Sequence, residues 1–399
     1  LFRPDQLRQQ VVARLLAAGD APAAAVLIRR ALDGLPPSPA AAGLWNNLGN
    51  VLLESGHADE AAQAYERSLQ LAPGTARTWV NRATALRLLR RLDEAAAAAE
   101  RATEVDADDA ESWYALSRAQ IEAGRIREGL RSHSHAVLRW PRQTIARDQV
   151  LRALTLLGHR EEAAALYRDW LAEEPGNAVA LHQLAACSDD TAPPPRARDA
   201  YVQAMFDSFA GTFDGKLAKL DYRAPQWVAD ALARKLPQSA ALSVADLGCG
   251  TGLCGPLVRR WAARLTGCDL SAGMLAQARA RGCYDELVQS ELTAFLATGP
   301  ARFDVLLSAD TLCYFGDLGD FARTAAAALR PGGLIVFTVE ADESTCAFTL
   351  RTSGRYAHSR HHLRGTLVAA GFVVEDIQAQ ALRLEAGEPV AGYVVSARR

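Results

Sequence analysis

Large apolar, small and helix-ending residues recur at a fixed interval through the first half of the chain. Trp45, Trp79 and Trp113 lie 34 residues apart, and Leu48 and Gly49 follow the first of them within one helical turn. This spacing predicts helices that each carry one apolar stripe, with two helices in each period. Because a single pair cannot bury its stripes, we expect the pairs to stack into a superhelix with a concave face.

The same interval fixes the bounds of the units. Ala61, Tyr65 and Pro73 complete the first clear period after Trp45. We expect repeats at about 5–38, 42–75, 76–109, 110–143 and 144–177, followed by a closing helix at 178–187. The pattern resembles the tetratricopeptide repeat, with Tyr in place of Phe, whereas a generic alanine-rich bundle would not space Trp and Pro so regularly.

Polar residues at repeated positions are candidates for a groove, since arrays of this kind commonly bind extended peptides or partner proteins. Asn47 and Asn81 share one repeat position, and Asn50 lies about one turn after the first of them. An amide both donates and accepts hydrogen bonds, so these residues would hold a peptide backbone. Arg118 would bind acidic groups. We assign these four residues to substrate binding, against the alternative that Asn is a common structural residue of the repeat.

Three consecutive prolines interrupt the composition in the segment DDTAPPPRARD at 189–199. Such a run forms a stiff, extended segment rather than a helix. We therefore expect a repeat domain at 1–188, a linker at 189–199 and a second domain at 200–399 that opens with helices at 200–236.

Short apolar runs alternate with helical stretches in the second half. The runs are Leu242–Leu247, a second run that ends at Asp269, Phe303–Ala309 and Gly333–Val339. This alternation predicts an α/β domain with a parallel, doubly wound sheet. Two later segments, Phe372–Ile377 and Val390–Ser396, predict a terminal hairpin.

Glycines and acids stand where a nucleotide would bind. Gly248, Gly250 and Gly252 follow the first run directly and allow close approach of the backbone to a ligand. Asp246 precedes them, and Asp269 comes 17 residues after the last glycine, where an acid binds ribose hydroxyls. These residues alone leave nicotinamide and flavin cofactors open, because dinucleotide sites use a similar spacing.

Three segments together resemble the class I S-adenosylmethionine-dependent methyltransferases. They are VADLGCGTG at Val244–Gly252, CDLSAGMLAQAR at Cys268–Arg279 and LRPGGLIVFT at Leu329–Thr338. The segment Met205–Pro225, behind a repeat array, is similar to bacterial methyltransferases that contain tetratricopeptide repeats. The resemblance implies S-adenosyl-L-methionine as cofactor and a Rossmann-like, seven-stranded, mostly parallel sheet.

The resemblance also implies roles for single residues on the cofactor side. Asp246, Gly248, Gly250 and Gly252 would face the methionine part, Asp269 would accept both ribose hydroxyls, and Leu270 and Met274 would pack on adenine. Glu291 and Leu292, after the third strand, would lie near the adenine amino group, although Gln289-Ser290 departs from the common Gly-Asp form. Asp310 would lie near the transferred methyl group, and Tyr222, ahead of the first strand, is assigned to the same site.

The acceptor side is predicted from the loops after the fourth and fifth strands. Candidates are His358 as a base near neutral pH, Arg355 as an anion clamp, and also Tyr314, Glu340, Tyr356 and, from an aromatic lid segment, Phe213. A carboxylate or thiolate acceptor needs no base, whereas an amine or alcohol does. The segment Asp310–Tyr314 differs from Asn-Pro-Pro-Tyr, which weighs against amide and nucleobase methylation.

Composition indicates which kinds of partner and which compartment to expect for the protein. Hydrophobic residues make up 49% and charged residues 23%, a globular balance, and the net charge of −2 gives no general attraction to nucleic acid. No apolar stretch reaches about 18 residues and no leader opens the chain, so we expect no membrane span and a cytoplasmic location. Seven cysteines without a CxxC pair indicate a reducing compartment and no metal site.

These observations predict a methyltransferase whose array recruits a peptide or protein acceptor. The alternative is a small-molecule carboxylate or hydroxyl methyltransferase that uses the array for scaffolding or homo-oligomerisation. A scaffold with a catalytically inactive domain is disfavoured by the intact glycines and acids.

Overall fold

The computed structural model describes residues 21–141, 144–188, 193–237, 241–344 and 346–399. Part of the expected first repeat (5–20) and part of the expected linker (189–192) lie outside the described residues. The chain divides into two compact units, Leu1–His159 and Arg160–Arg399. None of the helices in the described part combines the length and apolarity that crossing a membrane requires.

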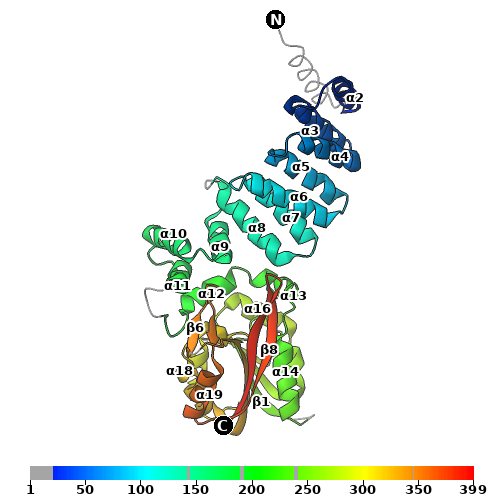
Figure 1. The fold of residues 1–399 in the computed structure, drawn as a ribbon. Coiled ribbons are helices and arrows are strands. Elements are labelled where there is room, and N and C mark those ends of the chain that lie inside the picture. The colour runs from blue at the N-terminus through cyan, green and yellow to red at the C-terminus, as the bar shows by residue number, and fades with distance from the viewer. Residues whose placement is uncertain (1–20, 142–143, 189–192, 238–240, 345) are drawn as a thin grey trace. The chain divides into compact units, whose positions relative to one another are not determined.

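The first unit consists of helices that pair along the chain (Figure 1). Its helices are α2 (Ala21–Leu32), α3 (Pro39–Glu54), α4 (Ala58–Leu71), α5 (Ala76–Leu88), α6 (Leu92–Val105), α7 (Ala110–Glu122), α8 (Ile126–Arg139) and α9 (Arg147–Leu157). The pairs α3–α4, α5–α6 and α7–α8 fall within the repeats expected at 42–75, 76–109 and 110–143, apart from the first turn of α3.

Packing explains why the repeat needs its signature residues. A Cβ atom on Gly49 would lie 2.4 Å from the ring of Tyr65, so only glycine lets α3 and α4 approach this closely. The indole N–H of Trp79 donates to the carbonyl of Pro73 at 2.8 Å, and Trp113 donates to Ala107 at the same distance. Each of these Trp residues therefore fixes the turn that leads into its own helix.

The second unit begins with α10 (Arg160–Glu173) and α11 (Ala178–Cys187), ahead of the segment expected to separate the domains. The His182 ring stacks on Tyr201, with 4.0 Å between ring centroids, and its Nε2 lies 2.8 Å from the carbonyl of Gly354. These contacts tie α11 to residues far along the chain. The boundary between the two compact units falls after His159, so it lies earlier in the chain than the linker expected at 189–199.

One mixed sheet forms the centre of the second unit. Its strands are β1 (Leu242–Leu247), β2 (Ala262–Asp269), β3 (Glu286–Gln289), β4 (Phe303–Ser308), β5 (Leu329–Ala341), β6 (Phe348–Leu350), β7 (Tyr356–His358), β8 (Val373–Glu385) and β9 (Glu388–Arg398). The order is β3-β2-β1-β4-β5-β7-β6, with β9 antiparallel between β5 and β8. The described sheet thus has nine strands rather than seven, because the segment after β5 forms the short β6–β7 hairpin.

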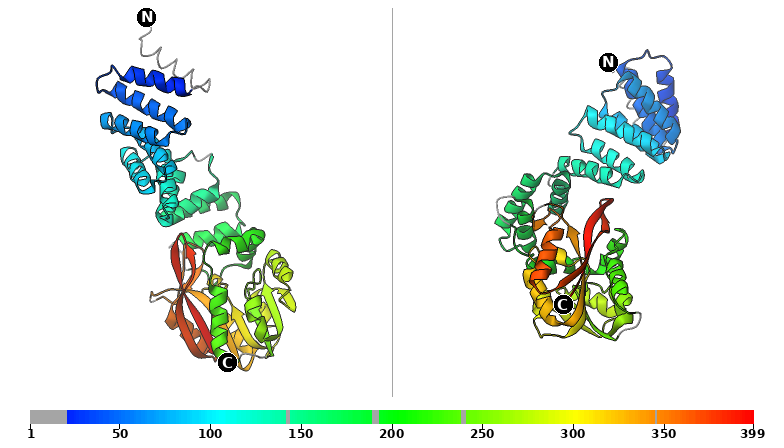
Figure 2. Two further views of the ribbon diagram at one scale, coloured as in Figure 1. Left: turned by 90° about the vertical axis from the view of Figure 1, so that its right-hand side faces the viewer. Right: turned by 60° about the horizontal axis from the view of Figure 1, so that its bottom comes forward.

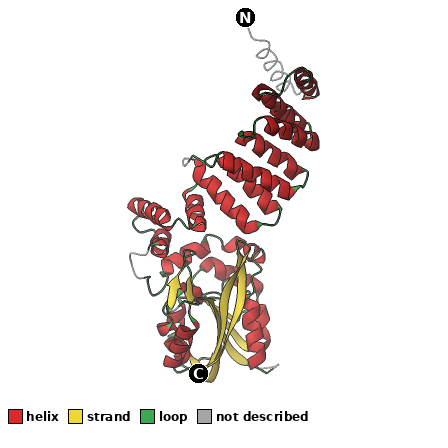
Figure 3. Cartoon of the chain, in the orientation of Figure 1, coloured by secondary structure: helices red, strands yellow, loops and turns green. Residues whose placement is uncertain are grey.

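Helices cover both faces of this sheet (Figure 2, Figure 3). The helices after α11 are α12 (Asp199–Asp207), α13 (Phe213–Ala218), α14 (Ala224–Lys235), α15 (Gly255–Val258), α16 (Ala272–Arg281), α17 (Leu292–Leu296), α18 (Gly319–Ala328) and α19 (Arg360–Ala369). Val228 of α14 and Val258 of α15 pack with Val244 of β1 on one face. Phe321 of α18 packs with Leu306 and Phe337 on the opposite face, in a cluster that also holds residues of α17 and α19.

A bulge in β8 changes which side chains face inward. The pairing with β9 shifts register between Ala381 and Arg383, so that Leu382 and Arg383 are both buried although they are adjacent in a strand. Regular alternation would bury only one of two neighbours. The bulge therefore brings a guanidinium group into the interior.

Candidate functional site

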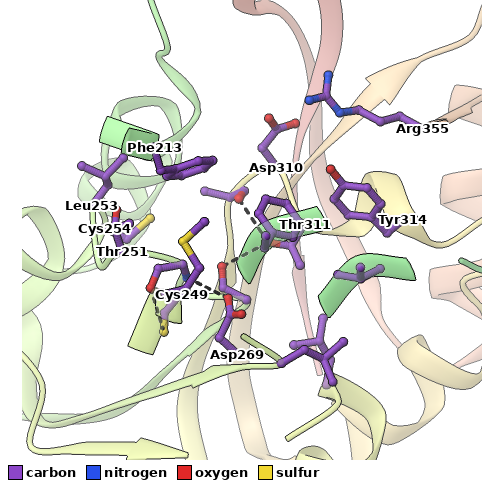
Figure 4. Close-up of a pocket in the computed structure, with 18 of the residues that line it drawn as sticks. Phe213, Cys249, Thr251, Leu253, Cys254, Asp269, Asp310, Thr311, Tyr314 and Arg355 are labelled. Atoms are coloured by element: carbon purple, nitrogen blue, oxygen red, sulfur yellow. Dashed lines mark hydrogen bonds between the residues drawn. The ribbon is translucent and has the colours of Figure 1, made fainter. Parts of the chain in front are cut away.

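A pocket opens at the carboxyl ends of β1, β2 and β4 in the second unit (Figure 4). The strand order reverses between β1 and β4, and such a reversal is where open α/β sheets bind ligands. The pocket encloses about 1100 Å³, including space open to solvent. Most of the residues that the sequence assigned to the cofactor lie on its wall.

The glycine loop after β1 turns sharply beside the pocket. Gly248, Gly250 and Gly252 have φ angles of 68°, 54° and 86°, in the left-handed region that glycine adopts without steric cost. A Cβ atom on Gly248 would lie 2.2 Å from the Thr311 side chain, so this position also requires close packing. Gly248 and Gly250 line the pocket, whereas Gly252 faces Tyr284.

Asp269 ends β2 with its carboxylate held by the backbone. One oxygen accepts the Gly250 N–H and the other accepts the Ser271 N–H, each at 2.9 Å. Burial raises the pKa of Asp269, and these two N–H groups partly oppose the rise. The carboxylate is therefore fixed in direction and lines the pocket, as a ribose ligand requires.

Asp246 lies beneath the loop and does not line the pocket. It is buried, and the Tyr284 hydroxyl donates to its Oδ2 at 2.6 Å, whereas Oδ1 has no partner among the described residues. Burial raises the pKa of Asp246 to about 7, although the bond from Tyr284 opposes the rise. Asp246 is therefore buried and is not among the described residues that line the pocket, whereas the resemblance implies that it faces the methionine part of the cofactor.

The residues expected around adenine gather on one side of the pocket. Leu270, Met274 and Leu292 supply apolar surface, and Glu291 completes the group. Glu291 also caps α17, since its Oε2 accepts the Ala294 N–H at 2.9 Å. Its carboxylate is therefore held in place by the helix that follows.

A buried ion network lies at the end of the pocket away from the residues expected around adenine. The Nη1 atom of Arg383 donates to both oxygens of Asp310, at 2.9 and 3.0 Å, and its Nη2 donates to Glu340. Its Nε donates to Glu385 at 2.8 Å. Burial lowers the pKa of Arg383, but Asp310 and Glu340 raise it above the ordinary value overall. Burial also raises the pKa of Glu340, against the effect of Arg383.

Asp310 itself has a left-handed backbone, with φ of 55°. This conformation is uncommon outside glycine and persists where the surroundings fix it. The Asp310 N–H donates to the Thr338 hydroxyl at 2.8 Å, and the ion pair with Arg383 holds the side chain. The acid expected near the methyl group is therefore in the pocket, with both oxygens already engaged.

Arg355 and Tyr314 line the pocket beside Asp310, and Phe213 lies across from them (Figure 4). Arg355 forms ion pairs with Glu385 and, at 3.7 Å, with Glu340, both through Nη1. Burial raises the pKa of Tyr314, against the effect of the Arg355 guanidinium. The two side chains are hydrogen-bonded to each other, and the Tyr314 hydroxyl also lies 3.9 Å from Met205 Sδ.

The other three acceptor-side candidates lie behind the wall. His358 in β7 is fully buried, and its Nε2 lies 3.1 Å from the carbonyl of Gly316. Burial lowers the pKa of His358 to about 4, so the ring is neutral above that range. Tyr356 donates to the carbonyl of Pro194 at 2.8 Å, and Glu340 is bound by arginines. Both faces of β7 and of the β5 segment around Glu340 are covered, so these side chains lie in the core instead of in the acceptor loop expected from the sequence.

The segment ahead of β1 closes one side of the pocket. Phe213 and Tyr222 both line it. Asp214 of α13 accepts the Thr251 hydroxyl at 2.6 Å and pairs with Arg281, and Asp207 of α12 accepts the Ser271 hydroxyl. The expected lid is thus fastened to the loops after β1 and β2.

The groove candidates of the first unit separate into two groups. Arg118 lines a small hollow between α5 and α7, together with Arg87 and Tyr114. Asn81 instead donates to Asn46 and Asn50, each at 3.1 Å. The amides of Asn50 and Asn81 therefore bind each other, and Asn47 is exposed outside the hollow.

Sequence reasoning missed Arg383, Glu385, Asp214 and Tyr284. A charge among apolar neighbours in a strand, as in Ala-Leu-Arg-Leu at 381–384, is the one signal that marks Arg383. Nothing local marks Asp214 and Tyr284, because their partners Thr251 and Asp246 are distant in the chain, and Glu385 becomes recognisable only once Arg383 is known to be buried.

The residues of this pocket fit the cofactor that the resemblance implies. Asp269 offers fixed acceptors for two hydroxyls, and Leu270 and Met274 offer an apolar surface for a base. The left-handed glycine loop leaves room for a chain that crosses its backbone.

Comparison with known proteins gives the same assignment. A methyltransferase domain model matches residues 245–337, and tetratricopeptide repeat models match 42–75 and 76–109, the bounds expected from the sequence. The chain is 31% identical over 175 residues to a ubiquinone biosynthesis O-methyltransferase of Bradyrhizobium sp. (strain ORS 278), covering 41% of this chain and 68% of that protein.

Two malonyl-[acyl-carrier protein] O-methyltransferases are also similar. The protein of Enterobacter lignolyticus is 36% identical over 116 residues, 29% of this chain and 46% of its own length. That of Pseudescherichia vulneris is 34% identical over 143 residues, 36% of this chain and 55% of its own length. The chain thus spans about half the length of these relatives.

Among solved structures, a Burkholderia thailandensis 1,6-didemethyltoxoflavin-N1-methyltransferase is 22% identical, with a TM-score of 0.42 over 53% of this chain and 93% of that one. The domain match and the Bradyrhizobium relative carry the assignment. The chain belongs to the S-adenosylmethionine-dependent methyltransferases, and tetratricopeptide repeats precede its methyltransferase domain.

Proposed function

We propose that the protein transfers the methyl group of S-adenosyl-L-methionine to an oxygen, nitrogen or sulfur atom of a peptide or protein that the repeat array recruits. The observation that carries the methyl transfer is the pocket at the ends of β1, β2 and β4, with Asp269 fixed on its wall. When bound, the cofactor supplies an activated methyl group on a sulfonium. The protein therefore mainly has to align the acceptor and exclude water.

On the cofactor side, Asp269 binds the ribose hydroxyls, and Leu270 and Met274 pack on adenine. Gly248 and Gly250 let the methionine part pass close to the backbone. Asp246 supports the glycine loop from beneath, through Tyr284 and its buried position.

On the acceptor side, Asp310, Tyr314 and Arg355 form the polar wall, and Phe213 forms the apolar wall. The lid segment excludes water because Asp214 fastens it to Thr251. His358 and Tyr356 act as core residues that hold the loop carrying Arg355.

Recruitment of a polypeptide is supported by the hollow between α5 and α7. Arg118 lies there over the Tyr114 ring, with its guanidinium carbon 5.8 Å from the ring centroid. An exposed guanidinium on an aromatic platform binds acidic side chains or a chain terminus. The seven free cysteines agree with a reducing compartment such as the cytoplasm.

The second candidate is a small-molecule carboxylate or hydroxyl methyltransferase. It is favoured by the names of the O-methyltransferases that are similar to this chain, and the array would then serve as a scaffold or form homo-oligomers.

One experiment tests the proposal and separates the candidates. The full chain is incubated with host lysate and cofactor labelled in its methyl group, and label is followed in polypeptides and in small molecules. We expect label on polypeptides, loss of that label in Arg118→Glu, and its retention in Arg77→Glu, which changes an exposed residue of α5 that does not line the hollow. Label confined to small molecules would favour the second candidate.

Asp269→Asn gives the matching test of the cofactor site. Loss of a charged acceptor weakens each hydrogen bond from ribose, so the affinity for S-adenosylhomocysteine falls about 10- to 100-fold by calorimetry. Asp320→Asn, at an exposed surface carboxylate, keeps the affinity of the unchanged protein. Equal affinities of the two variants for S-adenosylhomocysteine would show that Asp269 does not bind the cofactor.

A further inference from the structure

The described residues that line the pocket include no histidine or lysine that could take a proton from an acceptor, and their carboxylates are bound to protein donors. Four carboxylates are among the described lining residues, and each already accepts a hydrogen bond from the protein: Asp310 from Arg383, Glu291 from the Ala294 N–H, Asp269 from two backbone N–H groups and Asp199 from Arg196. An alcohol or amine acceptor would leave its proton without a recipient.

Arg355 differs from Arg383 in the donors that it keeps. Arg383 uses Nη1, Nη2 and Nε on three carboxylates of the protein. The ion pairs of Arg355 with described residues use Nη1 alone, and a hydrogen bond joins its guanidinium to the Tyr314 hydroxyl, so fewer of its donors are committed to carboxylates than those of Arg383. Its side chain retains 26% exposure, against 1% for Arg383, and it lines the pocket beside the Tyr314 hydroxyl (Figure 4).

Apolar side chains complete this end of the pocket. Phe206, Phe213, Leu217 and Leu220 of the lid segment line the wall. A guanidinium fork binds a planar carboxylate at two points, while an apolar wall favours the carbon chain attached to it.

We propose that the acceptor atom is a carboxylate oxygen, held by Arg355 and Tyr314 with its carbon chain against the lid. The proposal rests on the methyl transfer proposed above and names its substrate class. A lone pair of the carboxylate oxygen forms the new bond to the methyl carbon, and the carbon–sulfur bond breaks with its electron pair going to sulfur. The products are a methyl ester and a neutral thioether, and no proton moves, which agrees with the lack of a free base among the described lining residues.

The stability of the transferred methyl group in alkali tests the carboxylate proposal without any variant. Label transferred from the cofactor to lysate components is treated with alkali. A methyl ester releases its label as methanol, whereas methyl groups on nitrogen, sulfur or an ether oxygen stay in place. We expect release, and alkali-stable label would overturn the proposal. Release from polypeptides or from small acids identifies the source of the carboxylate.

Three matched probes test the binding site itself. Hexanoate, hexanol and hexylamine share one carbon chain, and each is titrated calorimetrically into the protein saturated with S-adenosylhomocysteine. We expect hexanoate to bind at least about 10-fold more tightly than the other two. Equal or tighter binding of hexanol or hexylamine would contradict a carboxylate site.

Variants of one loop provide the control. We expect Arg355→Gln to weaken hexanoate binding about 10- to 100-fold. The affinity of Arg355→Lys should lie between those of the unchanged protein and Arg355→Gln, because lysine keeps the charge but loses the two-pronged geometry of the guanidinium. Arg351→Gln removes a charge from the same loop and from the same Glu340, but lies outside the pocket, and keeps hexanoate binding. Equal loss in both Gln variants would mean that general charge, not a site at Arg355, binds the acid. Absence of both cofactor binding and labelling in the unchanged protein would instead refute the proposed methyl transfer.

Discussion

Arg383 is the residue on which the acceptor end of the pocket depends. Its guanidinium joins Asp310, Glu340 and Glu385, which come from three segments far apart in the chain. Removing one partner of a buried charge cluster leaves the others unpaired in a medium of low polarity. We therefore regard Arg383 as a positioning residue that orders Asp310 and leaves Arg355 available to the acceptor.

His358 shows how burial changes the role of a residue that the sequence suggests for catalysis. Its pKa is lowered from 6.5 to about 4, so its stabilising contribution is present above about pH 6.5 and is lost as the pH falls through 4. We expect the free energy of unfolding of the unchanged protein to decline over this window.

In His358→Gln that decline becomes smaller, because the amide keeps a donor for Gly316 but does not titrate. Urea unfolding at several pH values measures the effect, and the pH profile of methyl transfer serves as control. An activity profile that loses one of its steps in the variant would assign His358 to catalysis instead.

At the level of elements, α11 belongs to the repeat pattern but packs against the methyltransferase domain. His182 contacts Tyr201 and the carbonyl of Gly354, next to Arg355. Tyr356 and Leu350 pack with Ala186 of the same helix. The closing helix α11 therefore supports the loop that carries the proposed acceptor contact.

Two fragments test this assignment. The fragment 160–399 keeps α10 and α11, whereas 200–399 exposes Tyr356 and Tyr201, and we expect it to be less stable by about 2–4 kcal/mol. Urea unfolding of the two fragments measures the difference. Coincident transitions would show that α11 contributes nothing, and would favour the boundary expected at 189–199.

At the level of the whole molecule, the chain combines a helical array with one catalytic unit, each with its own core. A bound partner raises the local concentration of the acceptor without any new contact at the pocket. The fragment 160–399 should therefore methylate polypeptides about 100-fold less efficiently than the full chain.

The same fragment should bind S-adenosylhomocysteine as the full chain does, since the pocket lies entirely within residues 160–399. Initial rates with labelled cofactor, at equal concentrations of the two proteins, measure the ratio. Equal rates on polypeptides would assign the array a role other than recruitment.

The sequence by itself determined the repeat and the cofactor side, because both depend on local rules. The 34-residue interval reflects stacking of identical helix pairs, and two of the expected repeats have the bounds of the matched models. The glycine spacing and the acid that ends β2 likewise follow from short segments of the chain, and the structure places Gly248, Gly250 and Asp269 on one pocket wall.

Tertiary structure alone decided the acceptor side. The β8 bulge turns Arg383 inward, the β6–β7 hairpin buries His358 and Tyr356, and α11 joins the catalytic unit. Arg383, His358 and His182 each contact a residue more than 40 positions away in the chain, namely Asp310, Gly316 and Gly354. Periodicity and motifs describe neighbours in the sequence, so they carry no information on which distant charges will share a pocket.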